Sequence, residues 1–173
     1  MDTQIEKGLG DKQYKIAVYI ANIPPMEEYQ QLTQILSLLP GEIQVINQHC
    51  GNGWRKVFNV YAKLLFALDP QRFVFSQQAF SWQQYRDQNL LQSDSQTALI
   101  FGSPEVRDHH NAIRIICGKT HGQQSGGQFE FDWLDCHFAI CREHNIIICP
   151  YFDYRQLTNQ RIVRLAQLIN SLK

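Results

Sequence analysis

A glycine-rich loop followed by two basic residues is the first segment whose residue types suggest chemistry. The loop His49-Cys50-Gly51-Asn52-Gly53 precedes a helix that we expect to begin at Trp54, with Arg55 and Lys56 in its first turn. The free N–H groups at a helix start attract anions, and two glycines let a ligand approach the backbone closely. The loop is therefore typical of an anion site suited to phosphate, although both basic side chains could equally face solvent or pair with nearby acids.

Soft metal ligands crowd together near the carboxyl end of the chain. A stretch of 14 residues holds Cys136, His137, Cys141, His144 and Cys149, and thiolates and imidazoles are the ligands that zinc prefers. The stretch contains no C-x-x-C pair, however, and alternate residues of a strand point to opposite faces. We therefore interpret Cys141 and Cys149 as small buried apolar residues, and we expect no metal.

Other motifs for cofactors and catalysis are absent or incomplete. No G-x-G-x-x-G follows a strand, so the dinucleotide fingerprint is missing. Gly118-Lys119-Thr120 imitates the end of a phosphate loop, but that loop needs a glycine where Ile113 stands. A hydrolase using Cys50 and His49 ranks last among the hypotheses, because adjacent residues cannot easily face each other for proton transfer. Because the dinucleotide and phosphate-loop motifs are missing or incomplete, we expect no cofactor.

Composition indicates one globular domain in a reducing compartment. The chain has 173 residues, of which 44% are hydrophobic and 18% charged, which is enough for a real core. Its 16 basic and 16 acidic residues cancel, which removes the global argument for nucleic-acid binding but leaves a local basic patch open. No apolar run approaches the ~18 residues of a membrane helix. An odd number of cysteines, five, and a polar start indicate a cytoplasmic location without a membrane partner.

The elements that must position these residues follow from hydrophobic periodicity. We expect strands at residues 15–20, 97–101 and 112–117, a hairpin at 137–142 and 145–149, and helices at 26–39, 54–68, 80–91 and 157–172. Residues 1–13 are expected to be a flexible arm before a single domain at residues 14–173. The predicted fold is α/β, a three-layer α/β/α arrangement around a four- to five-stranded, mostly parallel sheet.

In such sheets, ligands bind outside the carboxyl ends of the strands. Here those ends lie at residues 22–25, 102–105, 118–121 and 150–154, and the loop at residues 49–53 should lie near them.

In their order, these elements resemble the uracil-DNA glycosylase superfamily, and its mismatch-specific uracil/thymine branch most of all. The strand that ends in Gly118-Lys119, the hairpin that runs into Pro150 and the final helix are similar to that branch. Asn52-Gly53-Trp54 is similar to the family's Asn shortly before Phe-Trp. The resemblance covers about two thirds of the chain as a pattern of elements.

The two catalytic motifs of that family are degraded. The first is of the G-x-N-P-G type, in which Asn or Asp orients the attacking water. Ala21-Asn22-Ile23-Pro24-Pro25 keeps the Asn, but its proline comes one residue late and both glycines are missing. The second is a small polar loop of the His- or Asn-Pro-Ser type, and the bulky Tyr151-Phe152-Asp153 stands in its place.

The resemblance implies a role for each matching residue. Asn22 would be the catalytic residue that positions water or polarises the base, and Asn52 would read the edge of the base. Tyr151, Phe152 and Tyr154 would form a wedge. Arg55, Lys56, Lys119 and Arg155 would hold phosphates, and the remaining ligand-binding residues would be Pro24, Trp54 and Asp153.

The expected function is a uracil-DNA-glycosylase-like domain that binds a nucleobase or DNA without full glycosylase activity. The alternative is a non-catalytic module that binds a protein partner or a small ligand. Whether the chain is an enzyme stays open at this point.

Overall fold

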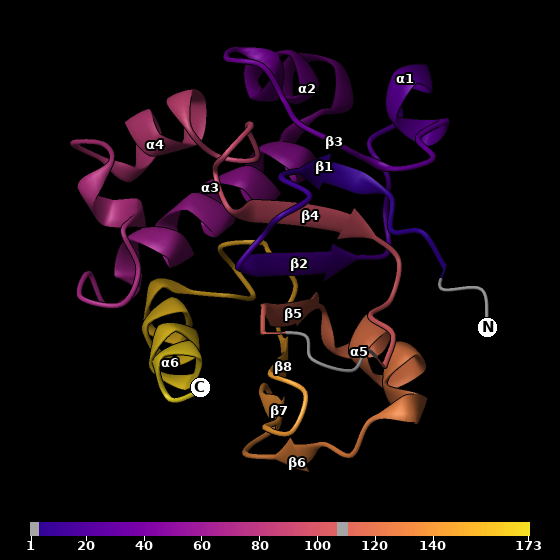
Figure 1. Cartoon of the computed structure of the whole chain (residues 1–173), viewed down its shortest axis with the longest axis vertical. Helices are drawn as coiled ribbons and strands as arrows, with labels where there is room; N and C mark the ends of the chain where they lie inside the picture. Colours follow the sequence, from indigo (N-terminus) through magenta and orange to yellow (C-terminus); the bar gives the residue numbers. More distant parts are fainter. Residues whose placement is uncertain (1–3, 107–110) are drawn as a thin grey trace.

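The computed structural model describes residues 4–106 and 111–173, and within these residues all strands join one sheet. The sheet has eight strands in the order β3-β1-β4-β2-β5-β8-β7-β6 (Figure 1). Their bounds are β1 Gly8–Gly10, β2 Ile16–Ile20, β3 Ile35–Leu36, β4 Thr97–Phe101, β5 Ile113–Cys117, β6 Asp132–Trp133, β7 Ala139–Cys141 and β8 Ile146–Cys149.

Helices alternate with these strands along the chain, so the protein has an α/β fold, as predicted. The helices are α1 Glu27–Gln30, α2 Glu42–Cys50, α3 Asn52–Ala67, α4 Trp82–Gln88, α5 Lys119–Ser125 and α6 Asn159–Asn170, with single 3₁₀ turns η1 Phe75–Gln77 and η2 Gly126–Gln128. Among the described residues, no helix is both long enough and apolar enough to cross a membrane.

The centre of the sheet is parallel. β2 pairs in parallel with β4 on one side and with β5 on the other, and β5 pairs in parallel with β8. Every residue of these four strands is buried, which explains why their sequences are nearly continuous apolar runs rather than alternating ones. These strands match those expected from the sequence closely.

The edges of the sheet correct the prediction of four to five mostly parallel strands. β1 is antiparallel to β4 and parallel to β3, while β7 and β6 add an antiparallel end beyond β8. β3 and β6 have two residues each, which is too short to produce a readable period. The sheet therefore has more strands than predicted, and it combines parallel with antiparallel pairs.

The expected loose arm is also corrected where it forms β1. Gly8 to Gly10 lie buried between β3 and β4. A Cβ on Gly8 would overlap the carbonyl oxygen of Leu99, so only glycine allows the two backbones to approach so closely. Two glycines around one leucine are typical of a loop in sequence, which is why the strand was missed. Residues 1–3 of that arm lie outside the described residues.

One face of the sheet carries α2, α3, α4 and α6 over the main core. Val57, Tyr61 and Leu64 on α3 are fully buried and belong to the same cluster as Val18 of β2 and Leu165 of α6. α3 begins at Asn52, two residues before the expected start. The helix expected at residues 26–39 is replaced by α1 and β3, and α4 covers only part of the helix expected at residues 80–91.

The opposite face is partly covered by α5. Ile147 of β8 belongs to the main core, whereas its neighbour Ile148 joins the cluster on the other face. A Cβ on Gly122 of α5 would lie 2.5 Å from Cγ2 of Ile148. α5 therefore packs directly on β8 through a glycine, and the sheet has helices on both faces.

Candidate functional site

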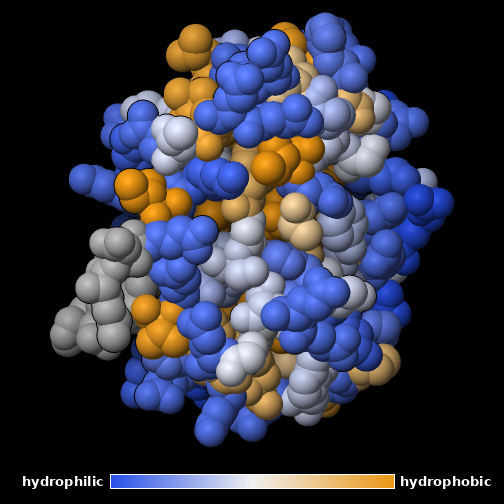
Figure 2. Space-filling view, turned by 90° about the vertical axis from the view of Figure 1, so that its right-hand side faces the viewer, coloured by the Kyte–Doolittle hydropathy of each residue, from blue (hydrophilic) through white to orange (hydrophobic). Residues whose placement is uncertain are grey.

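The strand order creates a switch point between β2 and β5. From β2 the chain continues to β3 and β4 on one side of the sheet, and from β5 it continues to β6, β7 and β8 on the other side. Ligands of open α/β sheets bind at such a point, outside the carboxyl ends of the strands. Figure 2 views this edge, toward which β2 and β4 point, and hydrophilic side chains (blue) predominate on it around smaller hydrophobic areas (orange).

Asn22 and Tyr151 meet at this switch point. Asn22 follows β2 and Tyr151 follows β8, and the Asn22 side-chain Nδ2 donates a hydrogen bond of 3.3 Å to the Tyr151 hydroxyl oxygen. Gly118 has a φ of +103°, and a Cβ there would lie 3.5 Å from the Tyr151 ring. Burial raises the pKa of the Tyr151 hydroxyl. The structure therefore brings these two predicted residues together.

Asp153 anchors the same loop to α3. Its Oδ2 lies 3.4 Å from Nζ of Lys56 and 3.0 Å from a guanidinium nitrogen of Arg155, and its Oδ1 accepts the Arg155 backbone N–H at 2.9 Å. The side-chain and backbone hydrogen bonds from Arg155, helped by Lys56, lower the pKa of Asp153 to about 2. Asp153 is thus a fixed anion that orients two cations.

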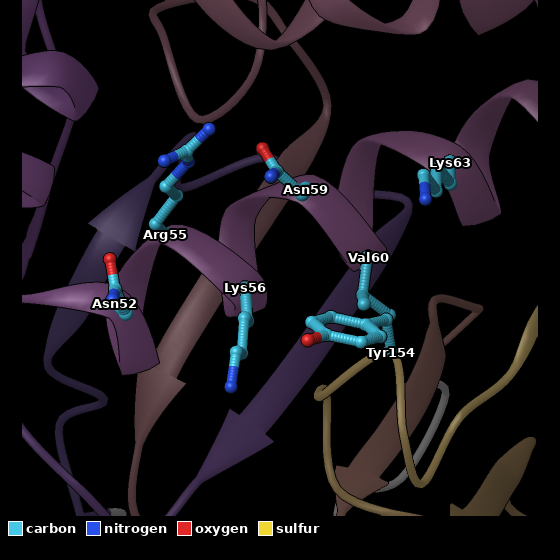
Figure 3. Close-up of a pocket in the computed structure, with 7 residues that line it drawn as sticks. All are labelled: Asn52, Arg55, Lys56, Asn59, Val60, Lys63 and Tyr154. Atoms are coloured by element: carbon cyan, nitrogen blue, oxygen red, sulfur yellow. The ribbon is translucent and has the colours of Figure 1, made fainter.

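A basic groove of about 300 Å³ runs along the exposed side of α3. Tyr154 forms its other wall and is 56% exposed, with Nζ of Lys56 lying 5.1 Å from the ring centroid. Figure 3 shows this ring lying against α3 beside Lys56 and Val60. The residues that line the groove are Asn52, Arg55, Lys56, Asn59, Val60, Lys63 and Tyr154.

A second cavity of about 380 Å³ adjoins this groove and shares Asn52 and Arg55 with it. Its lining is rich in amides and consists of Gln44, Asn47, Gln48, Asn52, Arg55, Arg86 and Asp87. Asn47 Oδ1 is buried there without a hydrogen-bond partner among the described residues. A buried acceptor without a partner is unfavourable. We call the two cavities together the α3 groove.

Arg86 joins the two parts of the α3 groove. Its guanidinium donates to Asn59 Oδ1 at 2.7 Å and pairs with Asp87 at 2.8 Å. The guanidinium carbon also lies 5.5 Å from the ring centroid of Trp82, and Nζ of Lys63 lies 5.0 Å from the same centroid. Cations and aromatic rings are therefore interleaved along this side of the molecule.

Lys119 lies at a separate cavity of about 280 Å³ on the carboxyl edge. Its Nζ lies 5.3 Å from the centroid of the Trp133 ring. The cavity is lined by Lys119, Cys136, His137, Pro150, Arg155, Gln156 and Arg161. Arg155 lines this cavity and directly follows Tyr154, which lines the α3 groove. The Lys119 cavity therefore lies next to the α3 groove.

Three of the predicted ligand-binding residues are buried and have structural contacts instead. Trp54 packs edge-on against Phe101 with the ring centroids 6.5 Å apart. Phe152 is fully buried against Tyr61, at 5.9 Å, and therefore cannot serve as the surface wedge that the resemblance implies. Pro24 is also buried. These three side chains complete the core rather than face a ligand.

Sequence reasoning missed Asn59, Lys63 and Arg86. The signal for the first two was present, because Asn52, Lys56, Asn59 and Lys63 recur at spacings of three and four and so share one face of α3. Arg86 carried no such signal, since only the packing of α4 beside α3 brings it to the groove.

The structure gives no support to a zinc site at the cysteines. Cys141 and Cys149 are buried, Cys136 is exposed, and His144 packs on Phe129 with ring centroids 5.2 Å apart. Within residues 4–106 and 111–173, no three metal-ligating side chains gather.

Comparisons with known proteins identify a family but no function. A family model described as "Family of unknown function (DUF6942)" matches residues 7–170. No curated protein matches the chain, and neither does any solved structure.

Proposed function

We propose, from the premise that this chain belongs to the DUF6942 family of unknown function, that it binds single-stranded DNA through the α3 groove without excising a base. The observation that carries this proposal is the groove itself, in which cations, an exposed tyrosine and amide side chains lie along one side of α3.

Local charge supports a polyanionic ligand. The groove and its rim gather Arg55, Lys56, Lys63, Arg86 and Arg155, and the acids among them are Asp87 and Asp153. The whole chain is neutral, so this excess of positive charge is a property of one side rather than of the composition. A concentrated basic strip is the electrostatic feature that nucleic-acid backbones require.

Tyr154 supports stacking of an unpaired base. Its ring is more exposed than buried and lies beside the cations that would hold the phosphates. Aromatic rings in basic grooves stack the bases of single strands, whereas bases inside a duplex already stack on one another. The groove is therefore better suited to a single strand than to a duplex.

The amides support contacts to the edge of a base. Asn52 and Asn59 line the basic part of the groove, and the amides Gln44 and Gln48 line the adjoining part. An amide presents both donors and acceptors, which match the edges of bases.

Binding without excision is supported by the surroundings of Asn22. Its amide nitrogen is held by Tyr151, and Asn22 lines none of the described cavities that carry the groove. An asparagine that holds an attacking water must lie within hydrogen-bond reach of both the water and a bound nucleotide.

A two-part assay tests this proposal. Fluorescence anisotropy with a labelled oligonucleotide should show saturable binding that weakens as salt increases, because bound cations release counterions from the strand. The same oligonucleotide containing uracil should remain intact after alkali treatment. Absence of salt-sensitive binding would contradict the binding claim, and strand cleavage would contradict the claim that no base is excised.

A further inference from the structure

A chain of hydrogen bonds joins two serines, a histidine and a backbone carbonyl at the carboxyl ends of β4 and β5. Ser103 Oγ lies 2.6 Å from Ser125 Oγ, which lies 3.2 Å from His121 Nδ1. The other ring nitrogen, His121 Nε2, lies 2.8 Å from the carbonyl oxygen of Gly102. None of these residues lines the α3 groove.

The carbonyl of Gly102 sets the direction of this chain. A carbonyl oxygen only accepts hydrogen bonds, so His121 Nε2 carries the proton and donates it. In the neutral ring Nδ1 is then the acceptor, and the Ser125 hydroxyl donates to it. The Ser125 oxygen can accept from the Ser103 hydroxyl in turn. A proton therefore has a continuous path from Ser103 to the imidazole.

The first member of this chain opens into a cavity. Ser103 is exposed and lines a cavity of about 170 Å³, together with apolar Ile5, Ile100 and Phe101, the basic residue Lys7 and the acidic residues Glu6 and Glu105. This volume is below the range of about 300–1,000 Å³ that holds drug-sized ligands. It suits a small acyl group.

We propose that Ser103 is the nucleophile of a second site, which hydrolyses small carboxylic esters. A nucleophile, a base within hydrogen-bond reach and a group that orients the base are the parts that nucleophilic catalysis requires. Here they are Ser103, His121 acting through Ser125, and the carbonyl of Gly102. Ser103 is the catalytic residue that touches the ester, and His121 and Ser125 position and move the proton.

The reaction balances with water as the only co-reactant. Ser103 Oγ attacks the ester carbonyl carbon, its proton passes to Ser125, and the Ser125 proton passes to His121 Nδ1. The carbonyl–alkoxy bond then breaks, and the alkoxide takes the proton back from the imidazolium through the same serine and leaves as the alcohol. Water attacks the acyl-serine by the same path, which releases the carboxylic acid and restores Ser103.

The test uses the full chain with a fluorophosphonate probe and with p-nitrophenyl acetate. We expect mass spectrometry to find the phosphonyl group on Ser103. Ser103→Ala should abolish the label, and His121→Gln should slow both labelling and ester hydrolysis about 100-fold, as loss of a general base does. The rate of wild-type labelling should increase with pH, and this increase should be absent in His121→Gln.

A matched control is Ser93→Ala, which removes an exposed serine at the opposite end of β4 and should leave the labelling rate unchanged. Labelling at another residue, no labelling at all, or equal rates and pH profiles for wild type and His121→Gln would overturn the proposal. None of these outcomes depends on DNA binding, so the experiment tests the Ser103 site independently of the α3 groove.

Discussion

The side chains of Asn22 and Tyr151 meet across the carboxyl edge of the sheet, although they lie 129 positions apart in the chain. Asn22 Nδ2 donates to the Tyr151 hydroxyl oxygen at 3.3 Å. This contact links the loop after β2 to the loop after β8, and the second loop also carries Asp153 and Tyr154. The orientation of the wall of the α3 groove therefore depends on contacts formed at the switch point of the sheet.

The variant Tyr151→Phe removes the acceptor of this hydrogen bond. We expect the free energy of unfolding to decrease by up to about 1 kcal/mol, because the exposed Asn22 amide can bond to water instead. Urea unfolding followed by circular dichroism measures this change. A loss of several kcal/mol would show that the contact holds the loop far more strongly than the geometry indicates.

The lowered pKa of Asp153 makes the free energy of unfolding depend on pH. Its pKa in the folded chain is about 2, below the value of about 3.9 for an unfolded aspartate. The ionised form therefore stabilises the fold above about pH 4, and this contribution is lost as pH decreases toward about 2. Wild type should lose more stability than Asp153→Asn between about pH 5 and about pH 3.

Parallel curves of unfolding free energy against pH for these two proteins would contradict this assignment. Asp135 serves as a comparison, because backbone hydrogen bonds from His137 and Phe138 also lower its pKa. Asp135→Asn should flatten the acid side of the curve as well, but without any change at the α3 groove.

The variant Gly8→Ala tests the position of β1 in the sheet. Its Cβ would overlap the Leu99 carbonyl oxygen, so we expect destabilisation by about 1–3 kcal/mol, as overpacking produces. The matched control is Gly53→Ala on α3, where the added Cβ would lie in open space. That change should stabilise the helix by about 0.4–1 kcal/mol. Equal melting temperatures for the two variants would contradict the docking of β1.

The central strands could be predicted because burial on both faces produces apolar runs such as Ile16 to Ile20. The carboxyl edge followed from those strands, and with it the proximity of Asn22 and Tyr151. β1 and β3 could not be predicted, because strands of two or three residues show no period. They pair through backbone groups, which no side-chain pattern reports.

The chemistry of the site was harder to predict than its place. A cluster of aromatic residues does not say which ring reaches the surface, and the packing on Tyr61 decides that Phe152 is buried while Tyr154 is exposed. In the sequence, His121 only marks the end of residues 118–121 at the carboxyl edge. Its partnership with Ser103 requires the turn at Gly102, where φ is +137°, and this turn is a property of the folded chain.

The cysteines should differ in thiol reactivity according to their exposure. Cys136 is exposed, whereas Cys117 and Cys149 are buried, and burial raises the pKa of the Cys117 thiol to about 12. Since the thiolate is the reactive form, we expect Cys136 to react first with a disulfide reagent and the buried thiols to react only after unfolding. Peptide mapping of the modified protein identifies each site. Rapid reaction of Cys117 in the native protein would contradict this order.

Tyr154→Ala should weaken the binding of single-stranded DNA by about 1–3 kcal/mol, which is the loss expected for one stacked base. The control is Phe80→Ala, because Phe80 is a fully exposed aromatic residue that does not line the α3 groove. Anisotropy titrations at one salt concentration measure both affinities. Equal losses for the two variants would argue against stacking on Tyr154.

The central claim is that cations of the α3 groove contact the phosphates of a single strand. The most direct measurement is the dependence of binding on salt for wild type, for Arg55→Ala/Lys63→Ala and for Lys12→Ala, which removes an exposed cation before the opposite end of β2. Each phosphate contact contributes about 0.7 to the slope of log affinity against log salt. We predict that the double variant flattens this slope by about 1.4 while Lys12→Ala leaves it unchanged. A double variant with the affinity and slope of wild type would contradict the account.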